Sequence, residues 1–592
     1  MSYSAPIKDM MFVIEHLSGL KDITALPGRE QFDADTAQAI LEECGKLCAE
    51  VVAPLNHVGD KQPSHFENGG VTTAPGFKQA FEQFVQGGWQ GLTHPEEYGG
   101  QEAPKLISTA TSEMLNAANL SFALAPLLTD GAIEALLTAA SDELKQKFIP
   151  NMISGKWTGT MNLTEPQAGS DLAAVRTRAE PQSDGSYKLF GAKIYITYGE
   201  HDLAENIVHL VLARCPHAPA GVKGLSLFVA PKFLVNADGS LGARNDIHCI
   251  SIEHKLGIKA SPTAALQYGD RGGAIGYLVG EENRGLEYMF IMMNAARFAV
   301  GLQGIAVSDR AYQKAVGYAR DRVQSKDLTG PEPVPIIHHP DVKRMLMTMR
   351  AYTEGARALA YFSAAACDLS KHHPDAEVRK QMFAFYEFTV PIVKGFSTEM
   401  SIDVTSLGVQ VHGGMGFIEE TGAAQFYRDA RILPIYEGTT AIQANDLIGR
   451  KTLRDGGATA GYILKEIAAT ESKLAASGSP AAQSMRAHLQ AGREALQKAV
   501  EFVAGKAKTE TKAVFAGSVT YLRLCGLVLC GWQMARSLLI AQTKEAEDPE
   551  FHNAKITTAR FYAEHLLSQA PGLGIAITQG GHSANDLNEN QF

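Results

Sequence analysis

The chain has 592 residues, of which 45% are hydrophobic and 20% charged, a balance typical of globular proteins and sufficient for several hydrophobic cores. Its formal net charge is -10 and it lacks a long block of Lys and Arg, which excludes nucleic acid as an expected partner because such binding depends on neutralising phosphates. Its seven cysteines follow no CxxC or Cys/His spacing, so we expect neither structural disulfides nor a metal site.

The N-terminus and the most apolar segment both argue against export and membrane insertion. The N-terminal stretch is amphipathic and interrupted by charged residues such as Lys8 and Asp9, without the basic start and unbroken apolar core of a signal peptide. Arg523 and Arg536 divide the apolar region 513–541 into segments shorter than the ~20 residues that span a bilayer. We therefore expect a cytoplasmic protein, with a buried helix in this region and no stable membrane insertion.

Residues 30 to 280 divide into a helical part and a strand-rich part. Up to about residue 150, apolar residues recur at helical spacing, with breaks at 87–88 and 94–100. From about residue 156 to 280, short β-rich runs such as 186–197 and 224–231 are separated by Gly, Pro, Asp and Asn. This pattern predicts a compact sheet domain.

After Gly285 the helical pattern returns. A Pro-rich segment interrupts it, and Met345, Met349 and Tyr352 then share one apolar stripe. A pair of glycines at 456–457 marks a composition shift, followed by Ala-, Lys- and Glu-rich helical segments. We therefore predict a mainly α protein with a central β domain, in these parts: an N-terminal helical domain (1–155), a middle β domain (156–283), a helical bundle (284–452) and a C-terminal helical extension (453–592).

Two runs near the strand-rich part suit a ligand that is planar or rich in oxygen atoms. Residues 161–171 set the hydroxyls of Thr164 and Ser170 around a turn whose backbone N–H groups could face a ligand, although an ordinary capped turn has the same pattern. Residues 193–199 form a short alternating strand that could place an aromatic ring and a hydroxyl beside a planar group. A plain strand would have the same sequence pattern.

Two later runs supply a glycine-rich segment and a carboxylate in apolar surroundings. Residues 410–417 contain three glycines within four positions, so the backbone can approach a ligand closely, but the spacing is neither the Rossmann nor the Walker pattern. In residues 427–443, Glu437 follows the apolar stretch 432–435. Apolar surroundings raise the pKa of a carboxylate from about 4.3 and make it a stronger base, so Glu437 is the candidate general base.

Together and in this order, the four runs resemble the signatures of the acyl-CoA dehydrogenase superfamily over about residues 40–450, and the helical extension is similar to that of its larger members. The resemblance implies an N-terminal helical domain, a small β-barrel domain and a four-helix bundle, with FAD as the cofactor. It also implies that Glu437 removes the α proton of an acyl-CoA thioester while the β hydrogen leaves as hydride to flavin N5.

The resemblance further implies a set of ligand contacts. Cofactor contacts within one chain are Met161, Leu163, Thr164, Gly169, Ser170, Tyr195, Thr197 and Thr439. Contacts to the flavin of a neighbouring subunit are Arg322, Gln324, Gln410, Gly413 and Gly414, which implies a homodimer. Substrate contacts are Ser170, Asn294, Arg297, Tyr436 and Gly438. For Arg297, an ion pair between packed helices explains the residue equally well, and His412 is expected to be structural.

The substrate implied by the resemblance is a short acyl-CoA. Length, opening and the wording of the later runs are most similar to bacterial members that oxidise 3-methylmercaptopropionyl-CoA and to their fatty acyl-CoA dehydrogenase relatives, so medium- or long-chain fatty acyl-CoA is the alternative. Electron-transferring flavoprotein is the implied acceptor, whereas an acyl-CoA oxidase would pass electrons to dioxygen. The acidic net charge and the intact motif at 436–438 argue against a DNA-associated damage-response relative of the fold.

Overall fold

The computed structural model describes residues 3–592, which form two compact units. Unit 1 comprises residues 46–103 and 118–296, and unit 2 comprises residues 3–45, 104–117 and 297–592. The helices α3 (Ala34–Leu47), α6 (Lys105–Ala118) and α9 (Gly285–Asp321) contribute residues to both units.

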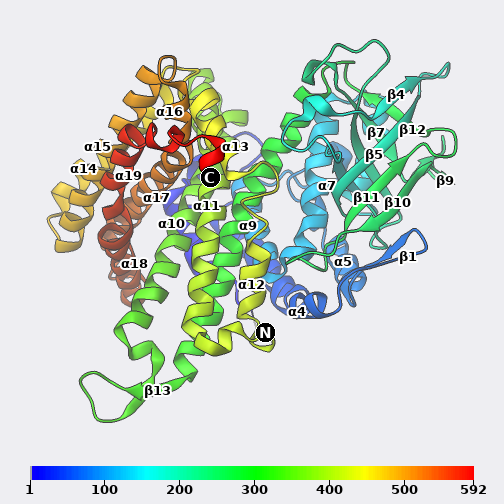
Figure 1. The fold of residues 1–592 in the computed structure, drawn as a ribbon. Helices are drawn as coiled ribbons and strands as arrows, with labels where there is room; N and C mark the ends of the chain where they lie inside the picture. Colours follow the sequence, from blue (N-terminus) through cyan, green and yellow to red (C-terminus); the bar gives the residue numbers. More distant parts are fainter. Residues whose placement is uncertain (1–2) are drawn as a thin grey trace. The chain divides into compact units, whose positions relative to one another are not determined.

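Unit 1 is built on an eight-stranded sheet in the region where strands were expected (Figure 1). The pairing order is β10-β11-β5-β12-β7-β6-β3, with β4 on β5, and β3 and β6 pair in parallel. The strands are β3 (Trp157–Asn162), β4 (Arg178–Pro181), β5 (Tyr187–Thr197), β6 (Asn206–Ala213), β7 (Ser226–Pro231), β10 (Ile247–Ile252), β11 (Thr263–Tyr268) and β12 (Ala274–Val279). Apolar side chains such as Leu189, Ile196 and Phe228 form the core of this sheet.

The helices of unit 1 are α4 (Pro54–Lys61), α5 (Phe77–Gln86), α7 (Leu120–Ala139) and α8 (Asp142–Ile153). The helices α7 and α8 pack against the sheet at β3, and glycine allows the closest approach. A Cβ on Gly159 of β3 would lie 2.5 Å from the Cβ of Ala132 on α7, so a side chain there would separate helix and strand. Figure 1 shows α7 running along the sheet.

Unit 1 also contains two small hairpins. One pairs β8 (Phe233–Val235) with β9 (Leu241–Arg244), and the other pairs β1 (His65–Glu67) with β2 (Gly70–Thr72). The β1–β2 hairpin lies in a segment predicted to be helical, so that prediction was wrong at this point. Its turn, Asn68-Gly69, has positive φ at both residues, the geometry that matches the twist of a two-residue hairpin.

Unit 2 is helical, apart from a hairpin of β13 (Val323–Lys326) and β14 (Pro333–Pro335). Its helices before the extension are α1 (Ile7–Phe12), α2 (Leu20–Thr24), α10 (Pro340–His372), α11 (Ala376–His412), α12 (Ala423–Ala430) and α13 (Thr440–Asp446). Those of the extension are α14 (Ala458–Ser477), α15 (Pro480–Lys506), α16 (Thr511–Ala516), α17 (Ser518–Thr543), α18 (Pro549–Phe561) and α19 (Ala570–Gln579). The predicted stripe of Met345, Met349 and Tyr352 is buried on α10.

The helix α17 confirms the prediction of a buried helix in the apolar region 513–541. It is one continuous helix of 26 residues that runs through Arg523 and Arg536. By length and composition alone, α7, α9 and α17 could each cross a membrane, but 78%, 67% and 83% of their apolar windows are buried within the fold. Figure 1 shows α17 packed beside α10 and α11.

A cluster of buried charges joins distant segments of unit 2. The guanidinium of Arg357 on α10 lies 2.7 Å from Asp9 Oδ2, 2.6 Å from Glu113 Oε1 and 3.1 Å from Asp309 Oδ1. The ammonium of Lys555 on α18 bonds Asp9 and, at 2.7 Å, Glu354. Burial alone would raise the pKa of Asp9, but Lys555 and Arg357 hold it well below its usual range. Asp9 therefore connects the N-terminal segment to both α10 and the extension.

We expect Asp9→Asn to destabilise the protein by about 3–5 kcal/mol, because it removes one partner from a buried ion cluster. Since the folded-state pKa of Asp9 is depressed, its contribution is present at neutral pH and disappears as the pH falls below its unfolded-state value of 3.8. Denaturant unfolding measured against pH checks both points. Asp142→Asn, at a carboxylate whose side chain is 98% exposed, is the control, and an equal loss of stability in the two variants would contradict the prediction.

Candidate active site

The 161–171 loop of unit 1 is built around a buried ion pair. Lys193 on β5 donates to Glu165 Oε1 at 2.8 Å and to the carbonyl of Leu163 at 2.9 Å. Glu165 also accepts from the backbone N–H of Arg176 at 2.7 Å and from the hydroxyl of Thr177 at 2.6 Å. Although burial opposes it, Lys193 and these hydrogen bonds lower the pKa of Glu165 to about 2, whereas burial lowers the pKa of Lys193 to about 8. The pair fixes the course of an otherwise irregular loop.

Several predicted cofactor contacts lie on this loop and on the adjoining strand. The N–H of Ile194 donates to the carbonyl of Thr164 at 3.0 Å, which holds the loop beside β5. Gly169 is open, because a Cβ there would meet no atom within 4 Å, and Ser170 is exposed. Tyr195 has a φ of 60° and is 58% exposed. Met161 and Thr197 are half-buried, whereas the side chain of Leu163 is buried, so only its backbone remains for a ligand.

In unit 2, Glu437 lies in a turn of residues 433–438 that connects α12 to α13, called here the Glu437 turn. Its φ is 54°, a left-handed conformation that is uncommon for a residue with a Cβ. Gln443 on α13 donates to the carbonyl of Glu437 at 3.1 Å and to that of Gly438 at 3.2 Å. Thr439 caps α13 by accepting from the N–H of Ile442 at 3.4 Å.

Tyr436 ends a series of hydrogen-bonded side chains, and its neighbour Glu437 is affected by two cationic groups. The hydroxyl of Tyr436 donates to Gln303, whose amide donates in turn to Asn116 at 3.1 Å. Burial raises the pKa of Glu437 above its ordinary value, and the cationic groups of Arg297 and Lys394 oppose this shift. Burial thus makes the half-buried Glu437 a stronger base than a solvated carboxylate. The positive charges of Arg297 and Lys394 partly compensate its negative charge.

Lys394 on α11 was not identified from the sequence. Its side chain is buried, and its ammonium donates to the carbonyls of Leu433 at 2.9 Å and Gly438 at 2.7 Å. Burial lowers the pKa of Lys394 to about 7, even though Glu437 raises it. The one signal in the sequence was a lone lysine within the apolar stretch 390–396.

Arg297 and Asn294 lie on α9. The contacts of Arg297 agree with both roles expected from the sequence, an ion pair between packed helices and a substrate contact. Its guanidinium is 3.6 Å from Asp446 Oδ2, a long ion pair between packed helices. Its Nε atom is buried and has no hydrogen-bond partner among residues 3–592, so a donor remains for a ligand. Asn294 is half-buried.

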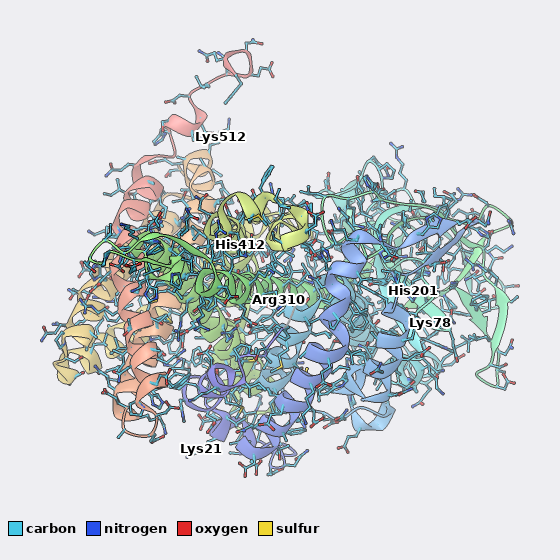
Figure 2. The ribbon with its side chains drawn as sticks, turned by 90° about the horizontal axis from the view of Figure 1, so that it is seen from below. Lys21, Lys78, His201, Arg310, His412 and Lys512 are labelled. Carbon is cyan, nitrogen blue, oxygen red and sulfur yellow. The ribbon has the colours of Figure 1, made fainter. Side chains whose placement is uncertain are left out.

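The residues predicted to act on a neighbouring subunit are exposed at two places in unit 2. Arg322 and Gln324 lie at the β13–β14 hairpin and bond each other at 3.3 Å. Gln410, Gly413 and Gly414 lie at the end of α11, where both glycines have open space at the Cβ position. The adjacent His412 (Figure 2) is buried, stacks on Tyr318 at 4.4 Å and bonds the carbonyl of Gly408 at 2.7 Å through Nδ1.

A cavity of about 340 Å³ also lies in unit 2, between α10, α11, α14 and α17. Its walls include Phe362, Phe385 and Trp532. The guanidinium of Arg536 lines it but is held by the carbonyl of Leu17 at 2.7 Å and by packing on the Phe362 ring. None of the predicted site residues lines this cavity.

Models of known protein families match the chain in four successive segments. It matches the acyl-CoA dehydrogenase N-terminal domain at residues 34–156, the middle domain at 160–270, the C-terminal domain at 283–452, and the acetyl-CoA dehydrogenase C-terminal-like domain at 463–588. The chain therefore belongs to the acyl-CoA dehydrogenase family, and is a FAD-dependent oxidoreductase that acts on the CH–CH bond of an acyl-CoA.

Individual relatives agree with this class. The chain is 53% identical to the 3-methylmercaptopropionyl-CoA dehydrogenase of Ruegeria pomeroyi, over 98% of this chain and 99% of that protein. It is 33% identical to a butyryl-CoA dehydrogenase of Syntrophomonas wolfei, over 100% and 99%. The fold is shared with an acyl-CoA dehydrogenase of Bacillus anthracis solved in complex with FAD, with a TM-score of 0.73, 21% identity, and coverage of 98% and 93%.

The residues of the 161–171 loop fit a flavin nucleotide. The open backbone at Gly169 and the exposed hydroxyl of Ser170 suit an oxygen-rich group, and the exposed ring of Tyr195 suits a planar one. At the end of α11, the buried Nε2 of His412 has no partner within the described chain, and two open glycines follow it.

We expect Lys193→Met to loosen the 161–171 loop and lower FAD retention, because it leaves Glu165 buried without its ion partner. Breaking such a pair costs about 3–5 kcal/mol. Hydrogen exchange of the loop and the FAD-to-protein ratio measure the two effects. Lys188→Met, on the same strand, is the matched control, and the double variant Lys193→Met, Glu165→Gln should recover stability by removing the unpaired charge. Unchanged exchange in the single variant would refute the role of the pair.

Proposed function

We propose that Glu437 is the general base that removes the α proton of a bound acyl-CoA. The observation that carries this proposal is a half-buried carboxylate whose pKa is raised by burial and which is held in a left-handed turn beside Arg297 and Lys394. An α C–H is a weak acid, so the thioester oxygen needs hydrogen-bond donors as negative charge develops. The donors that the family likeness assigns are the backbone N–H of Glu437 and a ribityl hydroxyl of the flavin. When bound, FAD supplies the acceptor for the β hydrogen.

The other predicted residues take roles around this base. For the cofactor we assign Met161, Leu163, Thr164, Gly169, Ser170, Tyr195, Thr197 and Thr439, and for the flavin of a neighbouring subunit Arg322, Gln324, Gln410, Gly413 and Gly414. For the substrate we assign Ser170, Asn294, Arg297, Tyr436 and Gly438. The exposure of the hairpin and of the α11 end supports a homodimer, because these surfaces are open to a second copy. We further propose the four segments 1–155, 156–283, 284–452 and 453–592 as the working domains, a cytoplasmic location in a bacterium, and electron-transferring flavoprotein as the acceptor.

For the substrate we propose 3-methylmercaptopropionyl-CoA, with medium- or long-chain fatty acyl-CoA as the alternative. Whole-length identity of 53% to a relative named for this substrate supports the proposal, and so does the whole-length likeness to a butyryl-CoA dehydrogenase. A methylthio-propionyl group is about as long as a pentanoyl group, so a pocket shaped for it should accept short acyl chains.

We expect Glu437→Gln to bind FAD and acyl-CoA but to lose flavin reduction by about 10²- to 10⁴-fold, because the amide is nearly isosteric yet cannot accept the proton. Anaerobic bleaching of the flavin after mixing with acyl-CoA measures the rate. Glu420→Gln, at an exposed glutamate of the same unit, should behave as wild type. Bleaching of Glu437→Gln at a near-normal rate would show that another group is the base.

We expect catalytic efficiency to be highest for 3-methylmercaptopropionyl-CoA and butanoyl-CoA and to fall for octanoyl- and palmitoyl-CoA. Each methylene that finds apolar wall contributes about 0.8 kcal/mol, whereas one that meets a closed pocket end clashes. One artificial acceptor is used for all four substrates, so that only the acyl chain changes. A rise toward octanoyl or palmitoyl would support the fatty acyl-CoA alternative, and rapid peroxide release under air would indicate an oxidase.

A further inference from the structure

The two ends of the Glu437 turn are held by one side chain. The ammonium of Lys394 bonds the carbonyl of Leu433 at 2.9 Å, where the turn begins, and the carbonyl of Gly438 at 2.7 Å, where it ends. Between these two points the chain includes Glu437 in its left-handed conformation. A shift of either end would therefore rotate the carboxylate that the turn presents.

The side chain of Lys394 lies in closely packed surroundings. Lys394 lies in the middle of α11, and its side chain is fully buried. The neighbouring Gly395 allows close packing, because a Cβ there would lie 2.7 Å from Leu522 Cδ1 on α17. A buried ammonium has no water to bond, so its hydrogen-bond donors must be satisfied by the protein. Two backbone carbonyls of the Glu437 turn meet that requirement.

We infer that Lys394 is a positioning residue for the reaction: it bridges both ends of the Glu437 turn and supplies positive charge that keeps the Glu437 carboxylate ionised. This inference rests on the proposed role of Glu437 as the base. It goes beyond that role because it assigns the orientation and ionisation of the base to a residue on a different helix. Lys394 makes no hydrogen bond to the Glu437 carboxylate in the described structure, and we assign it no contact with the substrate.

The charge environment supports the electrostatic part of the inference. Lys394 and Glu437 act electrostatically on one another, and Arg297 on α9 acts on both. Glu399 on α11 also acts on Lys394. Arg297 in turn is affected by Asp446, Arg450 and Glu387. Tyr436 is neutral at ordinary pH, since burial raises its pKa. The hydroxyl of Thr440 bonds Glu399, which is exposed, and Glu399 raises the pKa of Lys394 less than Glu437 does. Removing the Lys394 charge therefore leaves Arg297 as the cation acting on Glu437.

The test is anaerobic single-turnover reduction of the FAD-loaded enzyme by butanoyl-CoA, followed across pH in wild type, Lys394→Met and Lys394→Arg. In Lys394→Met we expect the limiting rate to fall by about 10²-fold, the loss typical of a displaced catalytic group, with little change in substrate dissociation constant. The acidic limb of the rate profile should move upward by about one pH unit, because a nearby positive charge lowers the pKa of a carboxylate. Lys394→Arg keeps a charge and two or more donors, so it should restore the position of the limb.

Further variants separate positioning from a purely structural role. Lys555→Met removes another buried lysine of unit 2 and should lower the melting temperature without moving the limb. Adding Lys394→Met to Glu437→Gln should change the residual rate little, because the group that Lys394 positions is already gone. A full second loss of about 10²-fold in the double variant, or an unmoved limb in Lys394→Met, would overturn the inference.

Hydrogen exchange of residues 433–438 tests the bridge without turnover. Faster exchange in Lys394→Met than in Lys555→Met supports the bridge, and equal exchange overturns it, whichever acyl-CoA the enzyme accepts. Failure of wild type to be reduced by any acyl-CoA would instead overturn the proposed function. The two failures are therefore distinct.

Discussion

Unit 2 depends on the burial of one guanidinium. Arg357 keeps its charge at any accessible pH and is almost fully buried, so the fold must supply carboxylates to it. Asp9, Glu113 and Asp309 do so from α1, α6 and α9, while Lys555 of the extension shares Asp9. Because removal of any one partner leaves a buried charge, these segments pack as one body. The extension is therefore an integral part of the unit that carries Glu437.

The 161–171 loop of unit 1 and the Glu437 turn of unit 2 follow the same physical rule. An irregular backbone leaves carbonyl groups that no helix or strand satisfies, and their burial costs free energy unless a donor is supplied. Lys193 supplies it for Leu163, and Lys394 supplies it for Leu433 and Gly438. A lysine suits this task because its compact ammonium offers three donors without the fixed fork of arginine.

The sequence predicted the helix, sheet, helix order and singled out Glu437 as a carboxylate after an apolar stretch, because both follow from local patterns and short motifs. It could not reveal Lys394, whose partners are backbone carbonyls 39 and 44 residues further along the chain. Asn68-Gly69 was a recognisable hairpin signal, but strands of three residues are too short to stand out from flanking helical spacing. The buried helix predicted at 513–541 from its apolar composition is α17, whereas the helices α10 and α11 that pack against it lie far away in the sequence, so this packing could not be predicted.

The turn around Glu437 reconciles two opposed requirements on a carboxylate. Burial makes it more basic by raising its pKa, yet the same burial favours the protonated form, which is no base at all. Arg297 and Lys394 counter this shift with positive charge, and Glu437 in turn raises the pKa of Lys394, which burial lowers to about 7. Whenever Lys394 is protonated, its charge lowers the pKa of Glu437, so the carboxylate stays ionised to lower pH than Arg297 alone would allow. The two titrations are therefore coupled, and the lysine that holds the turn also extends the pH range over which the turn presents a base.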